Sequence, residues 1–453
     1  MFHPPSRPPS SRRYSRRETL WLLSLTTAGW ASSSLLSGCS VNPVTGEQQL
    51  MLMSPAQELA VDRQHAPQQF SNDFGAVQDE ALNRYLTRVG QEMAQLSHRP
   101  QVPYNYRAVN ATHVNAYTFP AGSTAVTRGI LLEMQNEAEL AALLGHELGH
   151  VNARHAAQRQ TRSLFTQLGL SGIGYLSSYY SQTAGMLVNS LGGVTSKALL
   201  SSYSRDDERQ ADALGMAYMA KGGHNPAGMV GLMELLSAQS KQKPNALETM
   251  FATHPMSRER LSTAKRRFQE SYRNHQAAPN NRARYMDHTA TIRAQKPTIE
   301  WIQKADTALA NKQVSQAESC LAKALKSTED DYTALVKMAK IQLAKGDARG
   351  AKRYVELAKH SYPNEAQALH VAAITNLTSG NPSAAHEDLL AYERVVPGNP
   401  QTTFLQGKAL DDMQRPSEAA RYYRAYLRRG SRDAYSHYAQ QRLQQWSQTN
   451  PQP

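Results

Sequence analysis

The sequence predicts a mainly α-helical, α+β protein in which a unit with a small sheet precedes a solenoid of paired helices. Three observations point to this fold class. A His-Glu-x-x-His pattern occupies residues 146–150, two segments of alternating apolar residues precede it, and a 34-residue period runs through the last third of the chain. A length of 453 residues is also enough for two or three folded units.

Composition and charge exclude two broad classes of protein. Hydrophobic residues make up 40% and charged residues 19%, and the mean hydropathy of −0.58 excludes a polytopic membrane protein. Five of the 50 basic and one of the 37 acidic residues lie within residues 1–38, which leaves a positive surplus of 9 for the rest. These bases are scattered, so no nucleic-acid partner is expected. The densest group has the spacing of a solvated helix face, with contact to anionic lipid or an acidic partner as the alternative: Arg421, Arg424, Arg428 and Arg429.

Residues 1–38 have the order of a secretion signal. A basic, Ser/Pro-rich stretch is followed by an apolar run over residues 20–36 and then by Leu36-Ser37-Gly38-Cys39. The run is too short and too interrupted for a permanent membrane span. Its end resembles a bacterial lipobox, which implies that Cys39 is acylated and becomes the first residue of the mature protein. An ordinary signal with an incidental cysteine is the alternative.

Three further residues bear on export and redox state. Cys39 and Cys320 are the two cysteines of the chain, which excludes a disulfide framework, and Cys320 is expected to be a buried thiol on a helix. Residues 15–20 resemble a twin-arginine signal, but Thr19 stands where phenylalanine is usual, which leaves the export route open. In a Gram-negative host, Ser40 after the cysteine, rather than aspartate, would favour sorting to the outer membrane.

The stretch His146-Glu147-Leu148-Gly149-His150 is the strongest chemical signal. Histidines four positions apart project from one face of a helix and can share a metal ion, while Glu147 can reach a water beside it. Catalytic zinc needs a third protein ligand, and Glu208 is the candidate. Asp212, four residues later on the same helical face, can hold a ligand histidine through its far ring nitrogen. Two satisfied histidines on a helix surface are the alternative.

Three nearby residues are not expected to bind the metal. Asp206 and Asp207 have no carboxylate four residues later and suit the start of a helix. His155, five residues after His150, points away from the ligand face of a continuous helix.

These residues together resemble the gluzincin metallopeptidases of the HtpX, Oma and CAAX-prenyl-protease type. Three further stretches match in the correct order. Residues 42–46 resemble the entry segment of the family's periplasmic branch, and residues 114–122 with 126–131 resemble the strand pair before the active-site helix. Residues 251–255, with Arg260, resemble the His-Pro segment that follows the metal helices.

The resemblance implies one zinc ion per chain, held by His146, His150 and Glu208. Asp212 is then hydrogen-bonded to a ligand histidine, and Glu147 is the catalytic base. It also implies a role for His254 of the His-Pro segment, which either stabilises the oxyanion or takes the open position on the zinc and holds the enzyme off. A buried structural histidine is the alternative.

Two segments near the metal helix are expected to meet substrate. Residues 115–119 and 125–127 alternate as strands, so an extended peptide would pair with an edge strand at Asn115, Ala116 and Tyr117. Core packing is the alternative for the side chains of Tyr117 and Phe119. Residues 168–200 are too polar and glycine-interrupted for a membrane span and are expected to form a lid or a packing hairpin.

A 34-residue period governs the C-terminal third. Small residues recur where paired helices would cross closely: Ala317, Ala351, Ala385 and Ala419, and twelve residues before them Ala305, Ala339, Ala373 and Gly407. The pattern resembles tetratricopeptide repeats, four of them over residues 298–433, with a closing helix over residues 434–446. Such arrays make concave surfaces that bind peptides or proteins, and no residue in this one suits catalysis.

The expected domains are a lipoprotein signal peptide (1–38), a zinc metallopeptidase domain (39–273), a linker (274–297) and a tetratricopeptide repeat domain (298–446). The expected function is a zinc-dependent endopeptidase of envelope protein quality control, which cleaves misfolded or misassembled outer-membrane proteins. It would act as a lipoprotein on the periplasmic side of the outer membrane, with the repeats binding a protein partner. The alternative is a repeat-based chaperone or assembly adaptor with a repressed zinc site.

Overall fold

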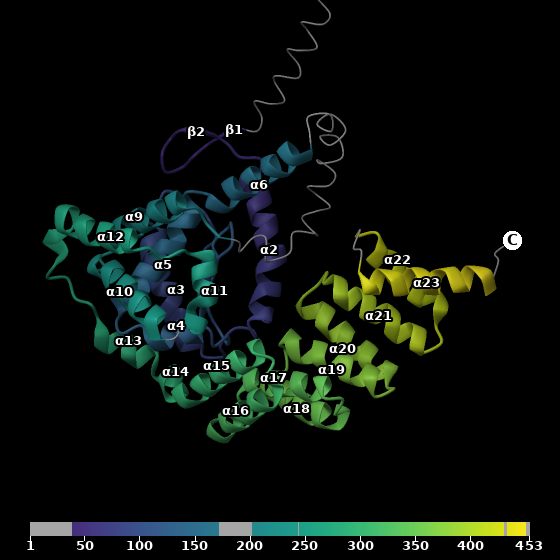
Figure 1. Ribbon diagram of the computed structural model, residues 1–453. Coiled ribbons are helices and arrows are strands. Elements are labelled where there is room, and N and C mark those ends of the chain that lie inside the picture. The colour runs from purple at the N-terminus through teal and green to yellow at the C-terminus, as the bar shows by residue number, and fades with distance from the viewer. Residues whose placement is uncertain (1–38, 172–201, 243, 430–432, 450–453) are drawn as a thin grey trace, which may run out of the picture.

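The computed structural model describes residues 39–171, 202–242, 244–429 and 433–449. The predicted signal peptide and most of the predicted lid lie outside these residues. Figure 1 shows a mixed part built around α5 (Glu137–Asn152) and a helical array that runs from α15 (Lys296–Ala310) to α23 (Ala434–Thr449). The predicted fold class, mainly helical with a small sheet, is confirmed. Within the described residues, no helix combines the length and the apolar character needed to cross a membrane.

Three short strands form the sheet of the mixed part: β3 (Asn105–Val109), β4 (Ala116–Thr118) and β5 (Ser123–Thr127). β5 lies between the other two, parallel to β3 and antiparallel to β4. The β4–β5 pair is the one that the sequence predicted, and Gly122 in its turn has a φ of +89°, which glycine adopts without steric cost. The sequence did not predict β3. A separate antiparallel hairpin joins β1 (Cys39–Val41) to β2 (Gln48–Leu50).

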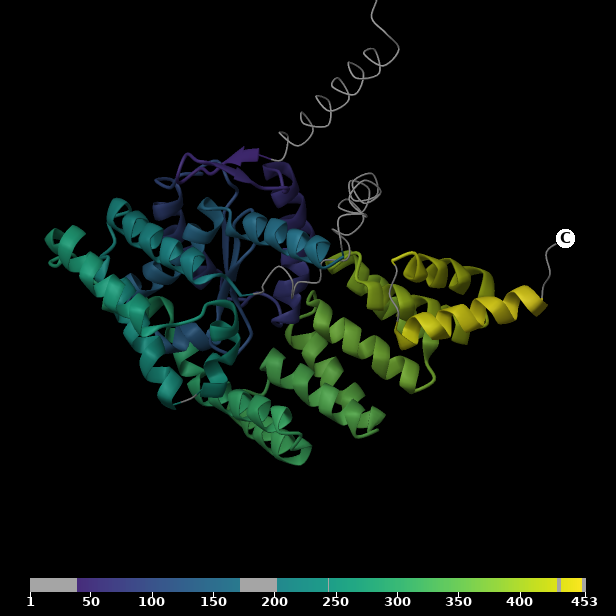
Figure 2. The same cartoon turned by 45° about the horizontal axis from the view of Figure 1, so that its top comes forward.

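Helices surround this sheet, and α5 lies at their centre, buried along its whole length (Figure 2). The others are α2 (Pro55–Asn72), α3 (Glu80–Ala94), α4 (Arg128–Glu133), α6 (His155–Ser171), α9 (Arg205–Lys221), α10 (Ala227–Gln242), α11 (Pro244–Thr253) and α12 (Arg258–Ser271). α3, α9 and α10 pack directly on α5. Leu86, Met93, Leu144 and Met219 belong to the apolar core that these helices share.

The crossing of α5 and α9 is close because small residues face each other across it. A Cβ added at Gly149 would lie 2.8 Å from the Ala211 carbonyl oxygen and 2.9 Å from its Cα. A Cβ at Gly145 would lie 3.2 Å from the Gly215 carbonyl oxygen. Backbone atoms cannot swing aside as a flexible side chain can, so a side chain at Gly149 would push α9 away.

The segment predicted as a linker packs onto the mixed part. It contains the 3-10 turn η2 (Arg273–His275) and the helices α13 (Arg282–His288) and α14 (Ala290–Ala294). Tyr285 is fully buried and donates a hydrogen bond from its hydroxyl to the Leu131 carbonyl at 2.6 Å. Ile292 joins the same core. These contacts fix the direction in which the array leaves the mixed part.

In the part of the chain that the structure describes, the array consists of four helix pairs and α23. The pairs are α15 with α16 (Val314–Ser327), α17 (Tyr332–Ala344) with α18 (Ala348–Ser361), α19 (Ala366–Thr378) with α20 (Pro382–Val395), and α21 (Pro400–Asp412) with α22 (Pro416–Leu427). The second helices begin at residues 314, 348, 382 and 416, which confirms the 34-residue period. The seven predicted alanines are fully buried at the crossings, and Gly407 leaves room for the ring of Tyr423, 2.7 Å from where its Cβ would lie.

Buried polar contacts join the array to the strands of the mixed part. Arg128, directly after β5, lies 2.7 Å from Asp331 Oδ2, and both side chains are almost fully buried. Its guanidinium also donates to Thr333 Oγ1 at 3.2 Å and to the Asn110 carbonyl at 3.0 Å. Phe74, which follows α2, packs against an apolar cluster of α17 and α19. The array is therefore anchored beside β5.

Candidate metal centre

Helix α5 carries His146, Glu147 and His150 on one face. Asn136 caps its start by accepting a hydrogen bond from the Glu139 backbone N–H at 3.0 Å. Because one helical turn separates His146 from His150, their Nε2 atoms lie 3.1 Å apart. The predicted helical spacing is thus present.

Helix α9 supplies the carboxylates. It starts with a capping box in which Asp207 accepts from the Ser204 backbone N–H, so this acidic residue lies at a helix start as predicted. The next residue, Glu208, is fully buried, and its Oε1 lies 3.3 Å from His150 Nε2. The close approach of α5 and α9 brings Glu208 to the histidines across 58 residues of sequence.

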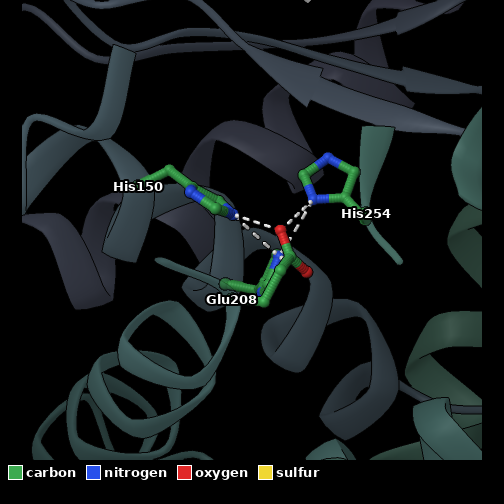
Figure 3. Close-up of side chains that lie close together, drawn as sticks. His150, Glu208 and His254 are labelled. Atoms are coloured by element: carbon green, nitrogen blue, oxygen red, sulfur yellow. Dashed lines mark hydrogen bonds and ion pairs between the residues drawn. The ribbon is translucent and has the colours of Figure 1, made fainter. Parts of the chain in front are cut away.

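His254, directly after α11, completes a group of four. Its Nδ1 lies 3.1 Å from Glu208 Oε1 and 3.3 Å from His146 Nε2, and Figure 3 shows its ring pointing at the carboxylate from the side opposite His150. One ligand atom from each of His146, His150, Glu208 and His254 lies within 4.8 Å of the others, and all four residues are buried.

The hydrogen bonds around His146 show that this group fits a cation. His146 Nδ1 lies 3.0 Å from Asp212 Oδ1. Burial acts to raise the pKa of Asp212, but its hydrogen bonds to His146 and Arg260 outweigh burial and lower the pKa. The ionised Asp212 therefore accepts from Nδ1–H, which leaves the lone pair of His146 Nε2 directed into the group. Lone pairs and a carboxylate that converge in a buried space form a donor set for a divalent metal.

Arg260 balances the negative charge behind the cluster. Its Nη2 and Nε donate to the two oxygens of Asp212 at 2.7 Å, and its Nη1 lies 2.5 Å from Glu208 Oε2. Burial would raise the pKa of Glu208, but its interactions with His254, His146 and His150 outweigh burial, so the pKa is lowered and Glu208 stays ionised.

Glu147 is a buried carboxylate without a hydrogen-bond partner. Among the described residues, neither of its oxygens accepts a hydrogen bond, and its nearest charged neighbour is His254, whose Nε2 lies 3.6 Å from Oε1. Burial raises the pKa of Glu147, although His254 and His146 act against this. A carboxylate of raised pKa beside a metal site can take up and release a proton.

Two of the predicted substrate residues, Ala116 and Tyr117, lie on the edge strand β4, and Asn115 directly precedes it. Tyr117 is 2% exposed and donates a hydrogen bond to Asp73 Oδ2 at 2.5 Å, and Phe119 is also buried, so core packing holds for both side chains. Asn115 and Ala116 are buried too. Any contact of these residues with a substrate would therefore use their backbone.

Two aromatic contacts at the site were not predicted from sequence. The ring of Tyr203 stacks on His150 with 3.8 Å between centroids, and the guanidinium of Arg159 lies over the Tyr203 ring, 4.4 Å from its centroid. Only the helical position of His150 could be read from the sequence, because Tyr203 precedes α9 in an irregular segment. Cys320 is a buried free thiol on α16, as predicted.

Comparison with known proteins adds a family resemblance to this geometry. Residues 80–268, which include all the residues of the cluster, match the sequence profile of peptidase family M48. This part of the chain therefore resembles peptidase family M48. The predicted resemblance to this class of metallopeptidases is confirmed, and the matched part holds the buried His/His/Glu/His group.

Relatives of this part of the chain occur in bacteria and mitochondria. The chain is 28% identical over 247 residues to a beta-barrel assembly-enhancing protease of Yersinia pestis, covering 53% of this chain and 50% of that protein. It thus spans about half the length of this relative. It is 26% identical to the metalloprotease YcaL of Escherichia coli, covering 54% of this chain and 95% of that one. It is 30% identical to the mitochondrial metalloendopeptidase OMA1 of Schizosaccharomyces pombe, covering 39% and 50%.

One solved structure, the APC/C hetero-tetramer Cut9-Hcn1, is similar over 70% of this chain and 61% of the other, with 15% identity. Its TM-score of 0.31 is too low to support an argument about the fold. The repeat architecture rests instead on the helix pairs and on their 34-residue step.

Proposed function

We propose that this protein is a zinc-dependent endopeptidase in which His146, His150 and Glu208 hold one zinc ion. The observation that carries the proposal is Glu147. Metal binding alone would not require a fifth ionisable side chain, buried and without a hydrogen bond, next to the cluster. Proton transfer during hydrolysis does require one.

Bound zinc would supply Lewis acidity, which activates water and polarises the carbonyl of the scissile bond. Glu147 would take the proton from the attacking water and later deliver it to the leaving amine. Asp212 would keep His146 in the tautomer whose Nε2 lone pair faces the metal, and Arg260 would keep Asp212 ionised and in place.

A substrate strand would pair with the edge of β4 that faces away from β5. Thr127 N–H donates to the Asn115 carbonyl and Phe119 N–H donates to the Ser123 carbonyl, so Asn115 and Phe119 turn their backbone groups towards β5. Since these groups alternate along an antiparallel strand, the backbone of Ala116 and Thr118 faces the other side. Both residues are buried, so this edge must be uncovered before a peptide can bind.

His254 would hold the resting enzyme off. Its Nδ1 lies at hydrogen-bonding distance from both His146 Nε2 and Glu208 Oε1, where it can act as a fourth ligand. Catalytic zinc sites keep one position open for water and substrate. His254 must therefore move before substrate reaches the metal, and it could then contact the oxyanion.

The proposed setting is the bacterial envelope. The names of the assembly-enhancing relatives support clients among misassembled outer-membrane proteins. Acylation of Cys39 would anchor the protein to the periplasmic side of the outer membrane, and the repeats would bind a client or partner protein. The division into signal peptide (1–38), peptidase domain (39–273), linker (274–297) and repeat domain (298–446) belongs to this proposal.

Cleavage of casein by the purified protein tests the activity. We expect zinc-dependent cleavage that a chelator abolishes and added zinc restores. Glu147→Gln should lower cleavage by about 10²- to 10⁴-fold while zinc still binds, because the proton acceptor is lost and the ligands remain. Zinc binding without cleavage by wild type and by His254→Ala would contradict the peptidase function.

A repeat-based chaperone or assembly adaptor with a repressed zinc site is the second candidate. The position of His254 in the cluster and the buried edge of β4 favour it. Under this function, Glu147→Gln would leave the delivery of clients unchanged, whereas the endopeptidase requires Glu147.

A further inference from the structure

His155 is fully buried, yet it is neither a member of the four-residue cluster nor part of the proposed reaction. Its position comes from a break in the helix. α5 ends at Asn152, Arg154 has a left-handed φ of 57°, and α6 begins at His155. The chain therefore changes direction, and the ring of His155 contacts the Nδ1 side of His150 instead of pointing away from it.

The break is held by buried contacts of Arg154. Its guanidinium lies 2.8 Å from Glu58 Oε1 and donates to the Met53 carbonyl at 2.6 Å and to Ser40 Oγ at 2.7 Å. A left-handed conformation costs a non-glycine residue about 1–2 kcal/mol, and such contacts offset that cost. The placement of His155 is therefore built into the fold.

Two hydrogen bonds assign the protons of the paired rings. His155 Nε2 lies 2.9 Å from Gln210 Oε1, which can only accept, so Nε2 carries a proton; the Asp207 carboxylate lies on the same side, with its Oδ1 3.7 Å from Nε2. His155 Nδ1 lies 2.9 Å from His150 Nδ1. In a neutral His155 the Nδ1 is then an acceptor, and the proton between the rings belongs to His150. His150 Nε2 is consequently bare on the side of the cluster.

We propose that His155 is a positioning residue for the metal: it accepts a hydrogen bond from His150 Nδ1–H and so directs the Nε2 lone pair of His150 into the cluster. The proposal rests on the proposed zinc site. It makes His155 the counterpart of Asp212, which does the same for His146. The opposite proton assignment would place a proton on His150 Nε2, where it would compete with the metal.

A neutral imidazole suits this position better than a second carboxylate. Glu147, Glu208 and Asp212 already lie in or next to the cluster, with Arg260 as the neighbouring guanidinium. Another buried negative charge would add a desolvation cost without a partner. A histidine orients His150 and adds no charge.

Zinc affinity of the full-length protein, measured by competition with a chromogenic chelator, tests the proposal. His155→Leu removes the acceptor and should weaken zinc binding by about 10- to 100-fold. His155→Asn places an amide oxygen near the position of Nδ1 and should stay within about threefold of wild type, whereas His155→Gln, whose amide reaches the Nε2 position, should behave like leucine. The melting temperature of each zinc-free variant is the control for folding.

Equal zinc affinity of wild type and His155→Leu would overturn the positioning role and leave the zinc site standing. Equal weakening by leucine and asparagine, with unchanged zinc-free melting, would show that ring packing alone matters. Failure of the wild type to bind zinc would overturn the proposed function together with this inference.

A second measurement needs no substitution at His155, so it tests the proposal even if the His155 variants fail to fold. The ¹⁵N shifts of labelled histidines in the zinc-free full-length protein report the tautomer, with His150→Gln used to assign the signal. We expect His150 protonated at Nδ1. A proton on Nε2 would overturn the proposal.

Discussion

The metal centre and the repeat array both bring helices together at small residues, but they bury different groups there. At the α5–α9 crossing, Gly149 and Ala211 let the backbones approach, and the space beside them is filled by ionisable side chains. At the crossings of the array, alanines such as Ala339 and Ala373 meet apolar side chains. One packing device thus serves both regions.

The two regions differ in how many partners each buried side chain depends on. Each repeat contacts mainly its neighbours, so the stability of the array is spread over similar interfaces. In the metal centre, His146, Glu208 and Asp212 each have several partners that must be present together. Substitutions at the centre should therefore alter function as well as stability, and equivalent ones in the array should alter stability alone.

The largest effect is expected where the two regions meet. Arg128→Ala would leave Asp331 buried without its charged partner, and we expect the free energy of unfolding to fall by about 3–5 kcal/mol. Urea unfolding measures this change, and limited proteolysis should show release of the array. Arg84→Ala is the matched control, because its exposed pair with Glu80 should contribute less than about 1 kcal/mol. Equal effects of the two substitutions would contradict a docking role for Arg128.

Adding a methyl group at each kind of helix crossing should distinguish the metal centre from the array. Gly149→Ala meets backbone atoms of Ala211, and Gly407→Ala meets the ring of Tyr423. We expect each to lower the free energy of unfolding by about 1–3 kcal/mol, through overpacking. Only Gly149→Ala should also weaken zinc binding, because it pushes Glu208 away from His150. Zinc titration of both variants checks this, and unchanged zinc affinity in Gly149→Ala would show that α9 does not need its close approach.

Local spacing made much of the site predictable from the sequence. His146 and His150 are one helical turn apart, as are Glu208 and Asp212, so each pair shares a face whatever surrounds it. The 34-residue period likewise placed the repeats, because each repeat packs in the same way against the next. Glu208 was the candidate for the third ligand because zinc needs one and Asp212 follows it by one turn, but only the family resemblance supported its placement opposite the histidines, since spacing does not reveal which helices cross.

Other features depend on long-range contacts or on breaks in regular structure. The prediction for His155 assumed a continuous helix, but α5 ends at Asn152 and the left-handed Arg154 follows before α6 begins. Asp331 lies 203 residues from Arg128, so no local pattern connects them. Tyr285 stands in a polar stretch whose composition suggested a linker, although its ring is buried in the core.

His254→Ala would test whether the metal centre rests in a closed state, a possibility that has no counterpart in the array. Removing the imidazole frees a position beside His146 and Glu208, and we expect casein cleavage to rise by about tenfold or more, equivalent to a closed state favoured by at least about 1.4 kcal/mol. Cleavage at equal zinc occupancy measures the effect. His360→Ala, at a surface position on α18, is the control. A loss of activity in His254→Ala would instead assign the residue to the oxyanion.

The smallest expected effect lies in the turns of the array, where one backbone conformation recurs with different residues. Lys312, Gly346, Gly380 and Gln414 all have φ between 59° and 78° and occupy equivalent positions in the four repeats. The left-handed conformation costs a residue with a Cβ about 1–2 kcal/mol, which glycine avoids. Glycine in turn lowers the free energy of unfolding by about 0.5–1 kcal/mol, because it has more conformational entropy in the unfolded chain. Lys312→Gly should therefore raise the free energy of unfolding by about 0.5 kcal/mol.

Gly346→Ala is the reciprocal change and should lower the free energy of unfolding by about 1 kcal/mol. No atom lies within 4 Å of the added Cβ, so only the cost of the left-handed backbone conformation remains. Urea unfolding of both variants measures the two signs, and zinc affinity should stay at the wild-type value in each. A destabilised Lys312→Gly would mean that the lysine stabilises the turn by more than its strain. A change in zinc affinity would mean that the array and the metal centre are coupled through more than their docking contacts.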